Sequence, residues 1–195
     1  MMTYSVYHLN PGYSQGMTDM LTPIVYVFID ESISYFAFCS LIDRYMNSLF
    51  DHDQIEIHRR LHLFDVIFQS VDHNLWKKIY SNEENSFLVS RWLLLDCKRE
   101  FHPFDHVLRA LELVWIHSMS SPCQSTVDQR GLFSIFLSMS ILQEDRQKIL
   151  DCSTEEDFYE YFYSSSPSSS RSSRSARRIL QRAQIYYSNY SSSSK

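Results

Sequence analysis

Apolar residues recur along most of this chain at the three- and four-residue steps of amphipathic helices. The clearest example lies within residues 54–73, where one apolar series steps by four, three, four and three residues: Ile57, Leu61, Phe64, Phe68 and Val71. Because a helix completes a turn every 3.6 residues, these side chains share one face. Residues 104–118 repeat the pattern and predict a second helix of the same kind.

The same pattern predicts further helices over residues 1–8, 15–29, 33–50, 75–80, 86–101, 131–143, 144–150 and 153–163. Ser32 or Glu31 is expected to cap the helix at 33–50, and Pro23 is expected to cause a kink or to lie within the first turns of its helix. Polar loops are expected at 81–85 and 118–130. Since no segment alternates with the two-residue period of a strand, the predicted fold class is all-α, in an irregular multi-helix arrangement.

The C-terminal part of the chain changes in composition. Residues 164–175 are rich in serine and arginine, and we interpret them as a solvated loop. A kinase target at Ser172-Ser173-Arg174-Ser175 remains the alternative. Residues 176–195 carry apolar side chains at helical spacing and are expected to form a closing helix that packs on the domain. The predicted organisation is therefore one domain over residues 1–163, followed by a loop and a closing helix.

Composition and charge exclude several classes of protein. The chain has 195 residues, of which 44% are hydrophobic and 15% aromatic, so it can bury a sizeable core. With three glycines and no Gly-x-Gly or Gly-Lys-Ser/Thr run, a dinucleotide or P-loop site is excluded. Residues 164–195 contain six basic residues and no acidic ones. Residues 1–163 therefore hold the other 12 basic residues and all 23 acidic ones, a net charge of −11. Such an acidic body argues against nucleic-acid binding.

Cysteine and histidine spacing indicates neither a disulfide framework nor a metal site. The four cysteines are far apart, as expected for reduced thiols in a cytosolic protein. Two histidine pairs lie four residues apart, His58 with His62 and His102 with His106, but neither has a third ligand nearby. The uncharged runs are also too short for a membrane span.

Two of the three glycines, Gly12 and Gly16, lie within one short stretch, residues 10–19. Gly12 follows a proline and indicates a tight turn, while Gly16 lets another backbone or a ligand approach closely. Gln15 is therefore expected to stand at the start of a new helix, on a turn of defined geometry. From these residues alone, a plain loop-to-helix junction is an equally good interpretation.

Three stretches resemble the TBC domain, the catalytic module of proteins that accelerate GTP hydrolysis by Rab GTPases. Tyr13-Ser14-Gln15-Gly16-Met17 resembles the Tyr-x-Gln-Gly motif of that domain. The run from Phe87 to Phe101, with Arg91-Trp92 and Lys98-Arg99-Glu100-Phe101, resembles a later helix, and residues 108–115 resemble the next one. Their order and spacing agree with the family over roughly residues 3–163.

The resemblance implies a regulator of a GTPase rather than an enzyme with its own substrate. Gln15 would be inserted in trans beside the γ-phosphate of a GTP-bound Rab, replacing the glutamine of the GTPase. Tyr13 would shape and pack the turn, Gly16 would permit close approach, and Asp19 would be a supporting polar contact. GTP and magnesium would belong to the partner, so no cofactor is expected in this chain. The chain would be cytoplasmic and would reach membranes only through its partner.

One part of the family pattern is missing. An Ile-x-x-Asp-x-x-Arg motif with a catalytic arginine precedes the glutamine in the family, whereas the first arginine of this chain is Arg44. We therefore expect a truncated domain, and a non-catalytic Rab-binding or scaffold protein remains the alternative. Apolar side chains such as Val25 and Phe28 should then be exposed and promote association. Leu93-x-x-Asp96-x-x-Arg99 superficially matches the missing motif, but we interpret it as an ion pair between Asp96 and Arg99 on one helix face.

Overall fold

The computed structural model describes residues 1–10, 12–80, 89–119, 131–163 and 174–193, and every regular element within these ranges is helical. The α-helices are α1 (Met2–Tyr7), α2 (Met17–Phe28), α3 (Glu31–Leu41), α4 (Ile55–Val71), α5 (His73–Ile79), α6 (Ser90–Leu94), α7 (Phe104–Met119), α8 (Leu132–Glu144), α9 (Arg146–Asp151), α10 (Glu155–Tyr163) and α11 (Ala176–Ser193). A π-helical turn, η1 (Ile42–Met46), and two 3₁₀ turns, η2 (Asn47–Leu49) and η4 (Lys98–Glu100), complete the list. The all-α prediction is confirmed.

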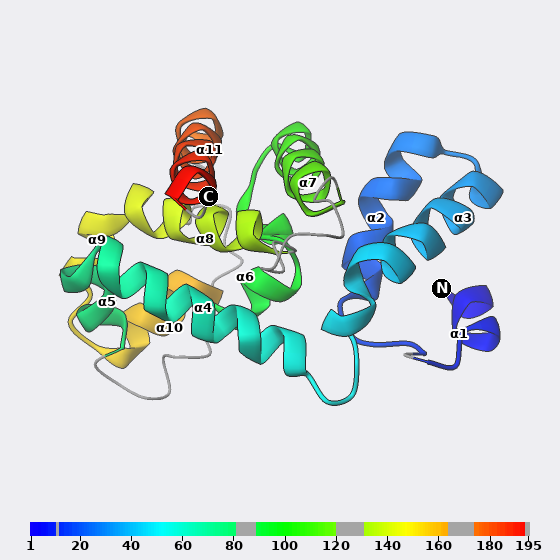
Figure 1. Cartoon of the computed structure of the whole chain (residues 1–195), viewed down its shortest axis with the longest axis horizontal. Coiled ribbons are helices and arrows are strands. Elements are labelled where there is room, and N and C mark those ends of the chain that lie inside the picture. The colour runs from blue at the N-terminus through cyan, green and yellow to red at the C-terminus, as the bar shows by residue number, and fades with distance from the viewer. Residues whose placement is uncertain (11, 81–88, 120–130, 164–173, 194–195) are drawn as a thin grey trace.

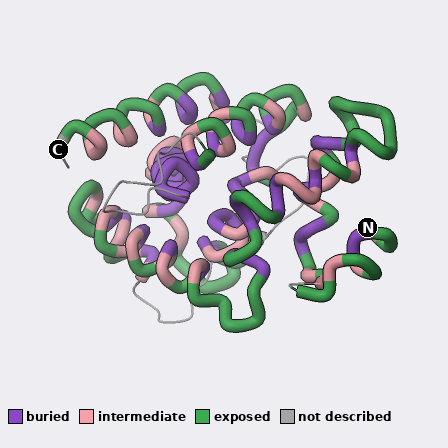
Figure 2. The backbone as a smooth tube through the Cα atoms, turned by 45° about the vertical axis from the view of Figure 1, so that its right-hand side comes forward, coloured by how far each residue is buried: buried purple, intermediate pink, exposed green. Residues whose placement is uncertain are grey.

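The core is built around α8, which lies between α11 and α4 in the left half of the view (Figure 1). Each residue from Leu132 to Leu142 is buried, and the tube view shows the same helix enclosed by its neighbours (Figure 2). Helices α4, α6, α7 and α11 pack around it. Helix α11 packs on α8 and buries Ile179 and Ala183 fully.

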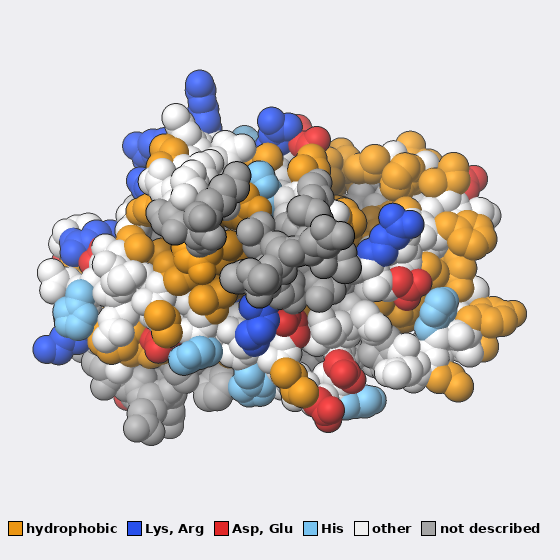
Figure 3. Space-filling view, in the orientation of Figure 1, with side chains coloured by type: hydrophobic (Ala, Val, Ile, Leu, Met, Phe, Trp, Pro, Cys, Tyr) orange, Lys and Arg blue, Asp and Glu red, His pale blue; other side chains and the backbone are white. Residues whose placement is uncertain are grey.

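Helices α1, α2 and α3 form one end of the molecule (Figure 1). Although α2 packs against α3, apolar side chains gather on the surface of this end (Figure 3). Those that are largely exposed on the three helices are Met2, Val6, Tyr7, Val25, Tyr26, Val27, Phe28, Ile33 and Phe36. Val25 and Phe28 are thus exposed, as expected from the sequence.

Two predicted helices are shorter than expected. The segment at 33–50 is α3 followed by η1 and η2, and its cap is Asp30, whose Oδ1 accepts from the Ile33 N–H at 2.9 Å, rather than Ser32 or Glu31. Within 86–101, α6 ends at Leu94, because Asp96 and Cys97 adopt positive φ angles of 47° and 57° that an α-helix cannot continue through.

Three predictions lie outside the described residues: the loop at 81–85, the loop at 118–130 apart from its first two residues, and most of the serine- and arginine-rich segment. Within the described part of the chain, no group of three or more potential metal ligands comes together. None of the helices in these ranges combines the length and the apolar character that crossing a bilayer requires.

Candidate functional site

Gln15 lies on the turn that leads into α2, two residues before the helix begins. Its side chain is exposed, and within the described residues its amide makes no hydrogen bond. Gly16 follows with a φ of 104°, and a Cβ there would lie 2.9 Å from Leu95 Cδ2. Only glycine fits this position, because any side chain would meet both backbone strain and Leu95. The turn predicted from the glycines is therefore present, with the carboxamide facing outward.

The turn is held on both sides of Gln15. Ser14 Oγ donates to the Phe50 carbonyl at 3.2 Å, and the Met17 N–H donates to the Ser14 carbonyl at 3.2 Å. Met17 itself is fully buried. Because its neighbours are anchored, Gln15 presents its side chain from a stiff backbone rather than from a loose loop.

Gln15 lines a cavity of about 520 Å³ between the start of α2, the start of α4 and α6. Its apolar wall is formed by Leu49, Phe50, Ile57, Leu61, Leu94 and Leu95. Polar side chains also line it: Ser14, Asp51, His52, Gln54, His58, Ser90, Arg91 and Arg99. With eight polar side chains beside Gln15 and six apolar ones, the cavity is mixed in character and offers a partner both hydrogen-bonding groups and an apolar wall.

Two further residues of the predicted site lie beside Gln15. The Tyr13 ring is 56% exposed, so it does not belong to the core. Asp19, in the first turn of α2, is held by two cations: Arg99 binds both carboxylate oxygens, at 3.0 and 2.7 Å, and Lys98 Nζ lies 3.3 Å from Oδ1. Partial burial alone would raise the pKa of Asp19, but the bonds from Arg99 and the charge of Lys98 lower it.

This pairing corrects the interpretation of Arg99. Its partner is Asp19, 80 positions away in the sequence, and not Asp96, because α6 ends before Asp96 and no helix face joins the two. Asp96 is instead fully buried, accepting from the Tyr45 hydroxyl at 2.9 Å and the Trp115 indole at 3.3 Å. This burial raises the pKa of Asp96, although the charge of Arg60 acts in the opposite direction.

Comparisons with known proteins identify the family of this chain. Residues 1–150 match the family described as the Rab-GTPase-TBC domain. The chain belongs to this family. TBC1 domain family member 17 of Homo sapiens is 35% identical over 116 residues, which are 59% of this chain and 18% of that protein. GTPase-activating protein GYP7 of Yarrowia lipolytica is 30% identical over 152 residues, 77% of this chain and 19% of that protein.

A solved Ypt/Rab-GAP domain has the same fold. The crystal structure of the Ypt/Rab-GAP domain of Gyp1p superimposes with a TM-score of 0.72 and 17% sequence identity, over 96% of this chain and 63% of that one. This TBC chain therefore spans about a fifth of the length of the curated relatives that it matches and less than two thirds of the solved domain.

Sequence reasoning missed two buried arginines of this TBC chain. Arg60 is 1% exposed, between Glu56 Oε1 at 2.9 Å and Asp96 Oδ1 at 3.7 Å. A signal was available, because Arg60 lies three residues after Ile57 and four before Phe64, on the apolar face of α4.

Arg174, interpreted from the sequence as part of a solvated loop, is also buried. It donates to Glu100 at 3.0 Å, to Asp145 at 2.6 Å and to the Tyr161 hydroxyl at 3.1 Å. The serine-rich composition around it gave no signal of this contact, because all three partners are far from it in the sequence.

Proposed function

We propose that this chain stimulates GTP hydrolysis by a Rab GTPase, by placing the Gln15 carboxamide beside the γ-phosphate of the bound nucleotide. The observation that carries the proposal is the position of Gln15: it is exposed, it lies on an anchored turn, and it borders a cavity. Membership in the Rab-GTPase-TBC family supports the choice of partner.

The chemistry suits an amide. Hydrolysis requires an attacking water aligned with the γ-phosphorus and stabilisation of charge on the phosphate oxygens. The carboxamide oxygen accepts a hydrogen bond from the water while its NH₂ group donates to the phosphate, and neither role needs a titratable group. GTP and Mg²⁺ are held by the GTPase, and we place the reaction in the cytoplasm, with membrane contact through the partner.

Gly16, Tyr13 and Asp19 have supporting roles in this proposal. Gly16 leaves room for the surface of the GTPase to approach the turn, since it carries no side chain. The exposed ring of Tyr13 offers the partner an apolar contact. Asp19 supports the turn from inside this chain and does not contact the GTPase, because its carboxylate is already paired with Lys98 and Arg99.

Single-turnover GTP hydrolysis by a panel of GTP-loaded Rab proteins tests this role. We expect Gln15→Ala to abolish the stimulation given by the wild-type chain, without changing the thermal unfolding midpoint. Gln69→Ala is the matched control, because Gln69 is an exposed glutamine on α4, outside the cavity. Unchanged stimulation by the Gln15→Ala variant would rule out the proposed role.

A specific observation favours the second candidate function, a non-catalytic Rab-binding protein. The two arginines that line the cavity with Gln15 are both engaged: Arg99 with Asp19, and Arg91 with the Phe162 carbonyl at 2.7 Å. In GTPase activation an arginine supplies roughly 10³–10⁵ in rate. Retention of a GTP-bound Rab in a pull-down without any increase in rate would favour this second function.

A further inference from the structure

We propose that Arg99, together with Lys98, is a positioning residue for Gln15 and acts through Asp19. This inference rests on the proposed function, since it names the device that keeps the carboxamide in place. It assigns to the Lys98–Arg99 pair a task that neither the sequence pattern nor the family match supplies.

The first step is the geometry of the ion pair. Arg99 Nε donates to Asp19 Oδ1 at 3.0 Å and Nη2 donates to Oδ2 at 2.7 Å, while Lys98 Nζ lies 3.3 Å from Oδ1. Two parallel bonds from a planar guanidinium fix the orientation of a carboxylate as well as its distance. The Asp19 and Lys98 side chains are mostly buried, at 15% and 12% exposed, so this arrangement is partly shielded from water.

The second step leads from Asp19 to Gln15. The Asp19 N–H donates to the Gly16 carbonyl at 2.9 Å, so Asp19 constrains the Gly16–Met17 peptide, which begins one residue after Gln15. The same turn touches Leu95, against which Gly16 packs with no room for a side chain. Residues 95–99 therefore hold the Gln15 turn at two points, by an apolar contact at Gly16 and by an ionic one at Asp19.

The third step is the rigidity of residues 95–99. The Cys97 N–H donates to the Trp92 carbonyl at 2.8 Å, and the Lys98 N–H donates to the Leu95 carbonyl at 2.9 Å. The next residue, Glu100, is buried and paired with Arg174 at 3.0 Å. The cations that hold Asp19 thus project from a segment that is itself fastened to the core.

A second Arg–Asp ion pair, between Arg146 and Asp72, provides a matched control. Arg146 binds Asp72 through Nε at 2.7 Å and Nη2 at 3.3 Å, and its side chain is 40% exposed, against 50% for Arg99. This pair joins α9 to the start of α5, far from the turn in the sequence. Arg146→Gln therefore removes an ion pair of the same type without touching the Gln15 turn.

Hydrogen–deuterium exchange tests the proposal without a GTPase. In the Arg99→Gln variant we expect faster exchange of the Asp19 and Met20 amides, both of which donate to the Gly16 carbonyl, and unchanged exchange in α8. Arg146→Gln should leave these amides as in the wild type. Unchanged exchange in the Arg99→Gln variant, or exchange that rises equally in α8, would overturn the proposal.

Single-turnover kinetics with a responsive Rab then separates positioning from direct contact. Because a misplacement of about 1 Å costs roughly 10²-fold in rate, we expect Arg99→Gln to lower kcat by up to that factor with little change in KM. Asp19→Asn should give a similar loss, and the double variant should lose no more than either single one. Losses that multiply, or a change confined to KM, would show that Arg99 contacts the GTPase instead.

The exchange and rate measurements test the positioning role and the proposed function separately. If the wild-type chain stimulates no Rab, the proposed function fails, yet the exchange experiment still decides whether Arg99 orders the turn. If stimulation is present and disappears in Gln15→Ala but not in Arg99→Gln, the function stands and the positioning role is wrong.

Discussion

Helices α8 and α2 are similarly apolar, yet they are buried to different extents. α8 is buried along its length because α4, α6, α7 and α11 surround it. α2 is buried only in its first eight residues, at Met17, Met20, Pro23 and Ile24, while its last turn is exposed. Burial therefore depends on the neighbours that a helix finds and not on its composition alone.

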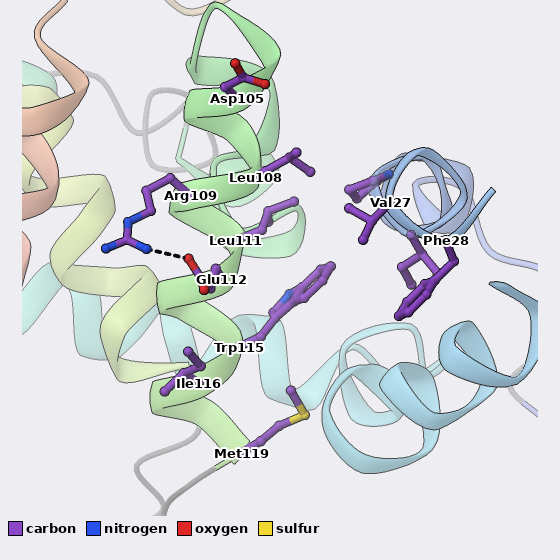
Figure 4. A pocket seen from close by; sticks show the side chains of 12 residues that line it. Val27, Phe28, Asp105, Leu108, Arg109, Leu111, Glu112, Trp115, Ile116 and Met119 are labelled. Carbon is purple, nitrogen blue, oxygen red and sulfur yellow. Dashed lines mark hydrogen bonds and ion pairs between the residues drawn. The ribbon is translucent and has the colours of Figure 1, made fainter. Parts of the chain in front are cut away.

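The side of α2 that faces α7 shows the difference most clearly. A groove of about 560 Å³ separates the two helices, with Val27 and Phe28 on one wall and Leu108, Leu111 and Trp115 on the other (Figure 4). At the start of α2, by contrast, Asp19 and Gly16 are held by residues 95–99. The helix that carries the candidate site is thus firmly fixed at the end next to Gln15 and loosely covered at the other.

Matched phenylalanine truncations should give the largest contrast between the two regions. Phe136 is 2% exposed on α8, and Phe36 is 70% exposed on α3. We expect Phe136→Ala to lower the free energy of unfolding by about 3–5 kcal/mol, through lost burial and a cavity. Phe36→Ala should cost about 1 kcal/mol or less. Urea-induced unfolding measures both, and equal losses would show that the α1–α3 end is packed as tightly as the core.

Self-association should be the next largest effect. We expect the isolated chain to associate with itself through the exposed end of α2. The Val27→Lys/Phe28→Lys double variant should weaken this association by roughly tenfold or more, because a tenfold change in Kd corresponds to only about 1.4 kcal/mol. Val66→Lys, on the exposed side of α4, is the control. Sedimentation velocity over a range of concentrations measures this, and a monomeric wild-type chain would contradict the expectation.

The smallest effect should be a pH dependence of stability that comes from Asp19. Its folded pKa is lowered from the usual 3.8, although partial burial opposes the shift, by the bonds from Arg99 and the charge of Lys98. The resulting stabilisation is therefore present above that pH and lost as the pH falls through the lowered value. Between about pH 5 and pH 3, Asp19→Asn should lose less stability than the wild type in thermal unfolding. An identical pH profile would show that the pair contributes nothing to stability.

Local patterns in the sequence predicted most of the helices and the Gln15 turn. The step of apolar residues located α4 and α7 within a few residues, and the two glycines located the turn. These features depend on neighbours in the chain, so they are readable without tertiary structure.

The features that the sequence did not reveal all depend on distant partners. Asp96 and Cys97 adopt positive φ angles although neither is a glycine, and the buried contacts of Asp96 with Tyr45 and Trp115 stabilise that conformation. Arg99 and Arg174 likewise find acids far away in the sequence. No local period encodes such pairs, which is why the motif around Arg99 was misinterpreted.

The cavity beside Gln15 is assembled from three separate stretches, 14–16, 49–61 and 90–99, so it exists only when the whole chain is folded. By thermodynamic linkage, any molecule that occupies it favours the folded state by an amount that grows with its concentration over Kd. A rise in melting temperature on adding a GTP-loaded Rab would then reveal the cognate GTPase, even for a variant that hydrolyses nothing.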